Sequence, residues 1–294
     1  MAVTTVRTPA RHGRSTVAGR GDHRTRYFNF FCGSVLLVFA AVWLIPLLWA
    51  IDTSVRPEAE ITTNPISWWT SHWNIDNYRQ VVNATDLPSW YLNSIVTSGL
   101  SAAFTVVVCS MAGFAISRTQ FRGKRIMLGL ILAGLLIPAQ VLILPLFREF
   151  NGLKLLNTYW AIVLPAIATP IAVFVFASFF DGLPKDLVES ARLDGAGWFR
   201  IYSRIFMPLC KPAISAVTIF TFVWTWNQLL WPLLVLSSTK LMTIPVGLAS
   251  VQSAYGIIYG QVMASAVLGA LPLILVFLLF QRRIVEGIAN TGIK

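Results

Sequence analysis

Residues 187–208 read LVESARLDGAGWFRIYSRIFMP and lie between two long apolar stretches of the chain. The segment is polar and has the residue spacing of a helix, and Pro184 stands shortly before it, where proline suits a first helical turn. Gly195 can adopt the left-handed conformation that ends a helix. We then predict a second short helix from Ala196 to Phe206, before Pro208 opens the next apolar stretch. We therefore predict two short helices joined by a glycine elbow.

The residues alone leave two interpretations of this segment open. Small side chains at Ser190, Ala191 and Gly195 would let a partner protein approach closely, so the two helices can form a rigid docking knob. Alternatively, the segment is an interfacial helix that rests on lipid headgroups.

The rest of the chain has the composition of a membrane protein. Of its 294 residues, 56% are hydrophobic and 12% are charged, whereas a soluble domain has about 25% charged residues. A helix needs about 20 apolar residues to cross a bilayer. We predict an all-α integral membrane protein with six transmembrane helices, in which a loop at 183–208 joins the fourth and fifth. The predicted spans are 28–51, 91–117, 126–147, 159–180, 209–236 and 260–281.

The placement of positive charge predicts the orientation, because Lys and Arg favour cytoplasmic loops. With the N-terminus inside, 18 of the 23 Lys and Arg residues fall on the cytoplasmic side, and so do both termini. This asymmetry and contact with anionic lipid account for the net charge of +11, so we expect no nucleic-acid partner. Residues 1–26 predict a disordered basic tail. We predict that residues 27–294 form the membrane domain, with an external segment at 52–90 and a cytoplasmic tail at 282–294.

The sequence lacks the residue patterns of an enzyme or of a metal site. Its three cysteines lie far apart, its three histidines do not cluster, and it contains no GxxxxGK[ST] phosphate loop. The charged side chains fall in tails, loops or span ends, whereas proton-coupled carriers commonly use ionisable residues within the membrane. We predict a transport subunit with no catalytic site, no metal and no cofactor of its own. Its energy would come from another chain.

The fifth predicted span carries a candidate substrate pathway. At about 100° per residue, Trp224, Asn227, Gln228 and Trp231 fall on one face of a continuous helix. Two amides flanked by two indoles suit a sugar-like ligand, because they offer hydrogen bonds to hydroxyls and flat faces to C–H groups. Pro232 would leave the carbonyl of Gln228 without its donor, which is tolerated beside a water-filled cavity. The alternative is a seam between helices, with the tryptophans at the membrane interface.

Gln140 is a second pathway candidate. It lies between Pro138 and Pro145 in the third predicted span. The alternative is that its amide bonds a neighbouring helix, as polar side chains within membranes commonly do.

The 183–208 loop resembles the EAA loop of ABC importer permeases. The family pattern has Glu and two small residues, a glycine four residues later, and an Ile-x-x-Pro ending; this chain departs from it by a serine at the second position and a methionine before the final proline. The resemblance implies that the loop docks into a cleft on an ATPase subunit and transmits its closure to the membrane helices. The residues implied in this coupling are Glu189, Ser190, Ala191, Gly195, Ile205 and Pro208.

Further stretches resemble the second permease subunit of maltose-type carbohydrate importers, a family that also handles glycerol-phosphate compounds. They are NS at 93–94, WNQLLWPLLVLSS, TIPVGL and the final FQRRIVEGIANTGIK. The family commonly has an acid or amide after Trp-Asn, and Gln228 here keeps hydrogen bonding without charge. The resemblance implies a six-helix type I importer permease of a prokaryotic inner membrane, with a sugar, a polyol or a glycerophospho compound as its cargo.

The same resemblance implies a heteromeric complex. Its other members would be a second permease subunit, two ATP-binding subunits that carry ATP and magnesium, and an external solute-binding protein. The companion permease would hold most of the substrate contacts.

Two other classes of protein remain as alternatives. A stand-alone secondary transporter or channel would pass its solute without a stable ATPase partner. A membrane scaffold or assembly factor would tolerate alanine at Trp224, Asn227 and Trp231 without loss of uptake.

Overall fold

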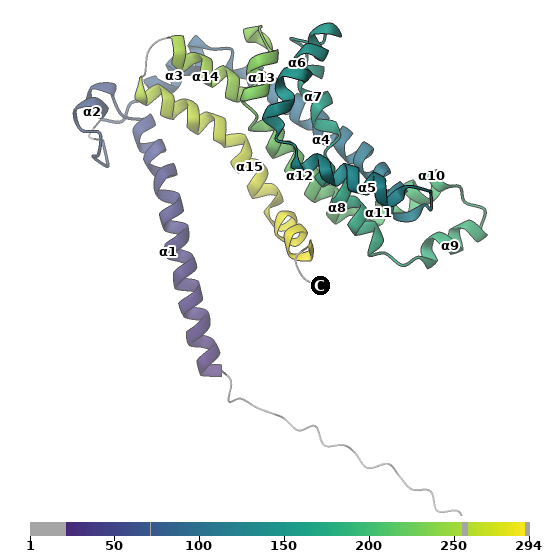
Figure 1. Ribbon diagram of the computed structural model, residues 1–294. Coiled ribbons are helices and arrows are strands. Elements are labelled where there is room, and N and C mark those ends of the chain that lie inside the picture. Colours follow the sequence, from purple (N-terminus) through teal and green to yellow (C-terminus); the bar gives the residue numbers. More distant parts are fainter. Residues whose placement is uncertain (1–21, 71, 255–257, 292–294) are drawn as a thin grey trace, which may run out of the picture. The chain divides into compact units, whose positions relative to one another are not determined.

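The structure, a computed structural model, describes residues 22–70, 72–254 and 258–291. Within these ranges every regular element is a helix (Figure 1). The α-helices are α1 (Asp22–Ser54), α2 (Glu58–Thr63), α3 (Asp76–Ala84), α4 (Leu87–Arg118), α5 (Lys124–Ala133), α6 (Ile143–Gly152), α7 (Trp160–Ile167), α8 (Pro170–Asp181), α9 (Asp186–Leu193), α10 (Trp198–Ile201), α11 (Met207–Leu209), α12 (Lys211–Trp226), α13 (Leu230–Val235), α14 (Ile244–Ala254) and α15 (Tyr259–Thr291). The shorter elements are the 3-10 turns η1 (Gly134–Leu136), η2 (Ala139–Leu142) and η4 (Thr239–Leu241) and the π-helical turn η3 (Tyr202–Phe206).

The chain divides into two compact units, Met1–Trp49 and Ala50–Lys294. The described part of the first unit is the larger part of α1. Its apolar side chains are exposed along its length, from Tyr27 to Leu48, as expected for a helix that faces lipid or a helix of another chain. Because α1 begins at Asp22, residues 22–26 of the predicted disordered tail are helical. The earlier part of that tail lies outside the described residues.

Helix α4 is the centre of the second unit. It packs against α7, α8 and α12 (Figure 1), and it buries a row of small and hydroxyl-bearing side chains that let neighbouring backbones approach. At Gly113 a Cβ would lie 2.7 Å from the Cβ of Phe176 and 2.9 Å from the backbone nitrogen of Ala177. Only glycine therefore fits where α8 crosses α4.

The predicted multi-pass helical fold is confirmed. Three stretches are long and apolar enough to cross a membrane alone, namely Tyr27–Ser54, Leu87–Arg118 and Tyr259–Leu279. Three further candidates are bent helix pairs, so the described residues contain up to six spans. These six overlap the six predicted apolar segments in order, but the fifth candidate, Trp198–Trp226, begins within the 183–208 loop and ends before the predicted bound at 236.

The third and fourth predicted spans are not continuous helices, and this corrects the prediction from hydropathy. The third bends by 93° ahead of Ala139, and the fourth bends by 43° ahead of Pro170. Proline disfavours the helical conformation in the residue before it. Accordingly, Ile137 before Pro138 and Thr169 before Pro170 are both extended.

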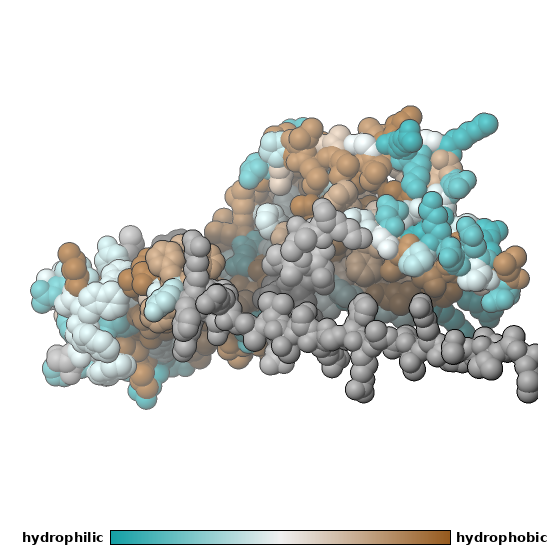
Figure 2. All heavy atoms as spheres, turned by 90° about the horizontal axis from the view of Figure 1, so that it is seen from below, coloured by the Kyte–Doolittle hydropathy of each residue, from teal (hydrophilic) through white to brown (hydrophobic). Residues whose placement is uncertain are grey.

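The second unit has two distinct ends. One end carries α9 and α10, and the opposite end carries α3, α13 and α14 (Figure 1). Figure 2 shows hydrophilic side chains gathered at the end with α9 and α10, and hydrophobic ones over the middle of the unit. This distribution is typical of a helical bundle whose middle faces lipid.

Buried Arg56 organises the segment that follows α1. Its side chain is fully buried and donates to the carbonyl oxygens of Ser67 at 2.7 Å and Asn64 at 3.2 Å. It also lies 3.6 Å from the carboxylate of Glu60 and 3.8 Å from that of Asp52. Because a buried charge needs such partners, this segment is a fixed structure rather than a loose connection.

Candidate functional site

The 183–208 loop has the glycine elbow predicted from its sequence. Helix α9 ends at Leu193, and Gly195 has φ +75°. The N–H of Gly195 donates to the carbonyl of Arg192 at 3.0 Å, and the N–H of Ala196 donates to that of Ala191 at 2.9 Å. These two bonds form a Schellman motif, the usual way to end a helix on a left-handed glycine. The elbow is therefore confirmed.

The second half of the loop is helical, as predicted at 196–206, but its bounds differ and it contains a π-helical turn. It runs from α10 through the π-helical turn η3 into α11, which ends at Leu209. Pro208 therefore lies within this helix instead of opening the fifth span. The chain then turns by 80° before α12 begins at Lys211. The turn follows from Pro212, whose ring excludes a continuous helical bond to the carbonyl of Pro208.

The inner face of the loop packs into an aromatic cluster with α4 and α8. The ring centroid of Phe114 lies 5.5 Å from that of Tyr202 and 5.1 Å from that of Phe206. The rings of Phe180 and Phe206 are 5.6 Å apart. The hydroxyls of Ser110 and Tyr202 form a hydrogen bond at 2.7 Å. The loop is thus tied to two helices of the bundle, and a displacement of the loop strains both.

The outer face of the loop carries exposed apolar side chains. Leu193 is 89% exposed and Phe199 is 72% exposed, and the guanidinium carbon of Arg192 lies 4.8 Å from the ring centroid of Trp198. Exposed apolar groups on a polar loop fit either a protein-docking surface or contact with lipid headgroups. The sequence analysis did not single out Leu193. Its position just before the glycine elbow was a signal, because that elbow places it at the tip of the loop.

The predicted coupling residues divide between the two faces of the loop. Ala191 is buried against the aromatic cluster, and Ile205 is half-buried. The hydroxyl of Ser190 donates to the carbonyl of Asp186, one turn earlier in α9. The exposed members are Glu189, Ser190, Gly195 and Pro208.

The predicted pathway face on the fifth span does not exist as one continuous helical face. Helix α12 ends at Trp226 and α13 begins at Leu230, so a rotation of 100° per residue does not carry through Asn227 and Gln228. Pro232 explains the interruption, since it leaves the carbonyl of Gln228 without a helical donor. The chain accommodates that carbonyl by ending one helix and starting another.

Two of the predicted pathway residues lie at the end of α12. The indole of Trp224 is 58% exposed and stacks on Phe220 with ring centroids 6.2 Å apart. The amide nitrogen of Asn227 donates to the carbonyl of Val223 at 2.8 Å, within its own helix. Gln228, the next residue, is half-buried. Trp224 is therefore exposed apart from its contact with Phe220, while the amide of Asn227 is already partly engaged.

Trp231 and Gln140 occupy different surroundings. The indole N–H of Trp231 donates to the carbonyl of Ala161 at 2.8 Å, and its ring lies 5.8 Å from that of Phe150. This is the geometry of the alternative interpretation, a seam between helices. Gln140 lies in η2 and is exposed. Among the described residues, no hydrogen bond joins Gln140 to the other pathway candidates.

A polar network at the end that carries α14 holds α4 to the chain between α13 and α14. The amide nitrogen of buried Asn93 donates to the carbonyls of Lys240 at 2.8 Å and Met242 at 2.9 Å. Its oxygen accepts from the hydroxyl of Tyr159 at 2.6 Å. The sequence signal was the Asn-Ser pair at the start of an apolar stretch. Sequence reasoning used that pair only as a resemblance and missed its structural role.

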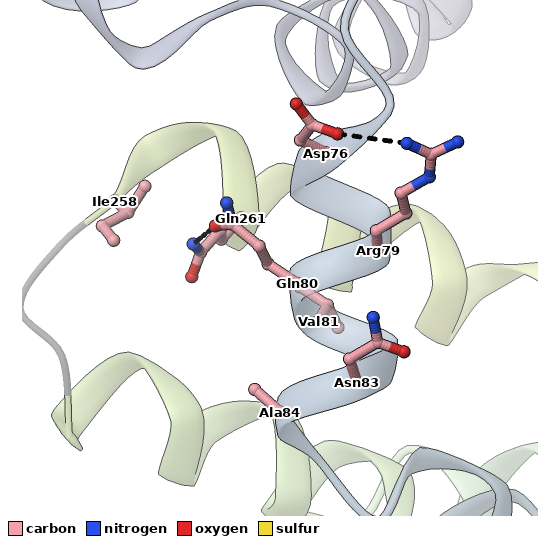
Figure 3. Close-up of a pocket in the computed structure, with 8 residues that line it drawn as sticks. All are labelled: Asp76, Arg79, Gln80, Val81, Asn83, Ala84, Ile258 and Gln261. Carbon is pink, nitrogen blue, oxygen red and sulfur yellow. Dashed lines mark hydrogen bonds and ion pairs between the residues drawn. The ribbon is translucent and has the colours of Figure 1, made fainter.

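The recess in Figure 3 lies between α3 and the start of α15 and has a volume of about 490 Å³. Asp76 and Arg79 point toward one another at 3.5 Å, and the side chains of Gln80 and Gln261 bond one another at 2.5 Å. Because these polar groups pair among themselves, they are not arranged to receive a ligand. The recess marks where α3 docks on α15.

The described residues show no cluster of three or more His, Cys, Asp or Glu side chains that would hold a metal ion. The three cysteines are unpaired thiols, and Cys109 and Cys210 are buried. No arrangement of nucleophile and base accompanies them in the described parts of the chain.

Residues 106–290 match the family described as the inner membrane component of binding-protein-dependent transport systems. This match covers more than half of the chain, including the 183–208 loop, and the chain belongs to this family. It is a multi-pass membrane protein and a transport subunit, as the resemblance of the loop implied.

Several characterised permeases are similar along most of their length. The arabinooligosaccharides transport system permease protein AraQ of Halalkalibacterium halodurans is 37% identical, over 89% of this chain and 94% of that protein. The sulfoquinovosyl glycerol transport system permease protein SmoH of Agrobacterium fabrum is 32% identical, over 90% and 93%. The trehalose/maltose transport system permease protein MalG of Thermococcus litoralis is 32% identical, over 89% and 95%.

A solved structure shares the fold. It is a chain of a bacterial ABC transporter involved in the import of the acidic polysaccharide alginate, with a TM-score of 0.78. The sequence identity is 20%, and the similarity covers 90% of this chain and 99% of that chain. The helical arrangement described above is therefore shared with a chain of that transporter.

Proposed function

We propose that this chain is a permease subunit of an ATP-driven, binding-protein-dependent importer of a sugar or of a related polyol or glycerophospho compound. The observation that carries the proposal is the 183–208 loop, with exposed Leu193 and Phe199 on its outer face and a packed aromatic inner face. The substrate class is supported by relatives named for arabinooligosaccharides, sulfoquinovosyl glycerol and trehalose or maltose.

The proposed complex contains a second permease subunit, two ATP-binding subunits and an external solute-binding protein. ATP and magnesium bind to the ATP-binding subunits, and this chain supplies no catalytic group. Both termini and the 183–208 loop are cytoplasmic in this proposal, which is supported by the excess of Lys and Arg on that side. Residues 52–90 then face outward, where the solute-binding protein delivers its cargo. The exposed apolar surface of α1 faces lipid or the companion permease.

The proposed mechanism is alternating access driven through the loop. Closure of the ATP-binding subunits displaces the knob that Glu189, Ser190 and Gly195 help to form. The buried side of the loop, with Ala191 and Ile205, passes that displacement to α4 and α8. A partner can shift the bundle between two states only if its contacts differ between those states, and we propose that the contacts of the ATP-binding subunits with the knob differ in this way.

The pathway candidates differ in exposure and in hydrogen bonding, and they do not support a pathway equally. Of the candidates, Trp224 has the exposed indole that a pathway residue needs, and Gln228 and Asn227 are its neighbours along the chain. We propose that this segment lines the route, with Gln140 as a more distant candidate. Trp231 contributes by holding α13 against α7.

The experiment that tests the proposed class is a purification of this chain, tagged at the N-terminus, from its native membrane in mild detergent. Mass spectrometry of the bound proteins should identify a phosphate-loop ATPase and a second permease. Recovery of this chain alone, stable and monodisperse, would instead favour a stand-alone secondary transporter and make the 183–208 loop a lipid-surface helix.

A further inference from the structure

Arg118, the last residue of α4, contacts the beginning of the 183–208 loop. Its Nη2 donates to the carbonyl of Phe180 and, at 2.6 Å, to the carbonyl of Leu183. Phe180 lies in the last turn of α8, and its carbonyl also accepts from the N–H of Leu183 at 3.1 Å. A cation at this end of a helix complements the helix dipole. Leu183 is the first residue of the loop. Arg118 therefore caps α8 and holds the point at which the loop leaves it.

The same side chain also contacts the end of the loop. The guanidinium carbon of Arg118 lies 5.1 Å from the ring centroid of Phe206, within the range of a cation–π interaction. Phe206 is fully buried and belongs to η3, on the half of the loop that returns to the membrane. A single guanidinium on a third helix thus binds both ends of the loop.

The guanidinium has a buried donor without a partner among the described residues. The Nε of Arg118 is buried and has no hydrogen-bond partner. A buried donor without a partner costs free energy, so the guanidinium is not fully satisfied in this arrangement. Arg122, four residues further along the chain, is exposed, unlike the buried Nε of Arg118.

We infer that Arg118 is a positioning residue that makes the end of α4 move with the 183–208 loop. It joins α8, the start of the loop and Phe206, so it carries a displacement of the loop into α4, the central helix of the bundle. This inference rests on the proposed function, because a displacement arises only if an ATP-binding subunit binds the loop.

The test uses the complete purified complex in lipid nanodiscs, with spin-labelled amino acids at Gln120, just beyond α4, and Phe220 on α12. Electron paramagnetic resonance measures the distance between the labels without nucleotide and after trapping with ATP, magnesium and vanadate. In a complex with native Arg118 we expect the distance distribution to shift on trapping. In Arg118→Met we expect equal vanadate trapping without that shift. Arg118→Lys, which keeps a cation and a donor, should restore part of it.

Arg122→Met is the matched control, since it removes the same charge nearby. In this variant the distance between the labels should shift as it does in the parent complex. A normal shift in Arg118→Met would overturn the inference and leave Arg118 as a helix cap only. If Arg118→Met does not assemble, Arg118→Gln replaces it, because a single amide cannot bind both the carbonyls and the Phe206 ring, and a normal shift there would overturn the inference in the same way. A parent complex that traps nucleotide without any shift would instead contradict the proposed coupling function.

Discussion

Replacement of Gly195 by alanine separates backbone geometry from side-chain contact. A Cβ at this position would meet no atom within 4 Å, so Gly195→Ala introduces no clash. Its effect comes from φ, which is +75°. A left-handed conformation costs an L-residue about 1–2 kcal/mol. Because about 1.4 kcal/mol corresponds to a factor of ten, the intact elbow should lose about 5- to 30-fold in population relative to opened forms.

The neighbouring glycine provides the matched control. Gly197 has φ −74° and ψ 161°, an ordinary extended conformation, and a Cβ there also meets no atom within 4 Å. Gly197→Ala should therefore be neutral, or stabilising by about 0.4–1 kcal/mol through the unfolded chain. Gly195→Asn is a second control, because asparagine tolerates the left-handed conformation better than alanine does.

The assay is the binding of the purified ATP-binding subunit to the permease pair in lipid nanodiscs. The apparent dissociation constant rises as the fraction of binding-competent elbow falls, so Gly195→Ala should weaken binding by up to the factor of about 5–30 given by the backbone cost. Gly197→Ala should bind as the parent protein does, and Gly195→Asn should fall between the two. Equal affinity for the two alanine variants would refute the argument that this elbow orients the docking surface.

Three further predictions concern packing and the pathway. Gly113→Ala places a Cβ 2.7 Å from a side-chain atom of α8 and should lower stability by about 1–3 kcal/mol. The measurement is the unfolding midpoint in detergent. Gly99→Ala on the same helix is the control, because its Cβ meets no atom within 4 Å and should not lower the midpoint. Asn93→Leu removes three part-buried hydrogen bonds and should lower stability by about 1 kcal/mol for each bond lost in the same measurement. Trp231→Phe breaks a hydrogen bond worth about 1 kcal/mol and should lower the midpoint. Trp224→Ala should leave the midpoint unchanged and reduce ATP-dependent uptake of the transported solute; loss of stability without loss of uptake at Trp224 would place it in a seam.

The apolar segments and the glycine elbow followed from local sequence. Six spans follow from hydropathy because a lipid-facing helix needs apolar side chains over its whole length. The elbow follows from Gly195, since glycine alone adopts its conformation at little cost. Both features depend on neighbours in sequence, so a single sequence contains the information.

The bends within helices and the contacts between helices were harder to predict from the sequence. Proline signals were present at Pro138, Pro170 and Pro232, yet hydropathy averages over them and predicts unbroken spans. The placement of Trp231 depends on Ala161, which lies far away in the sequence and offers a backbone carbonyl that no residue pattern reveals. The role of Arg118 was hidden in the same way, because its partners are carbonyls and a ring on other elements. Backbone acceptors are common to every residue, so their partners are found only in the fold.

The most direct test of the central claim places a photoreactive amino acid at Leu193, the 89% exposed residue at the loop tip, and irradiates native membranes. The same label at Leu153, which is 67% exposed where α6 ends, is the control. We predict a crosslink from position 193 to an ATP-binding subunit, changed in yield by ATP and vanadate, and none from position 153. A label at 193 that reacts only with lipid, or that gives the same adducts as 153, would contradict the assignment of the 183–208 loop as the docking element.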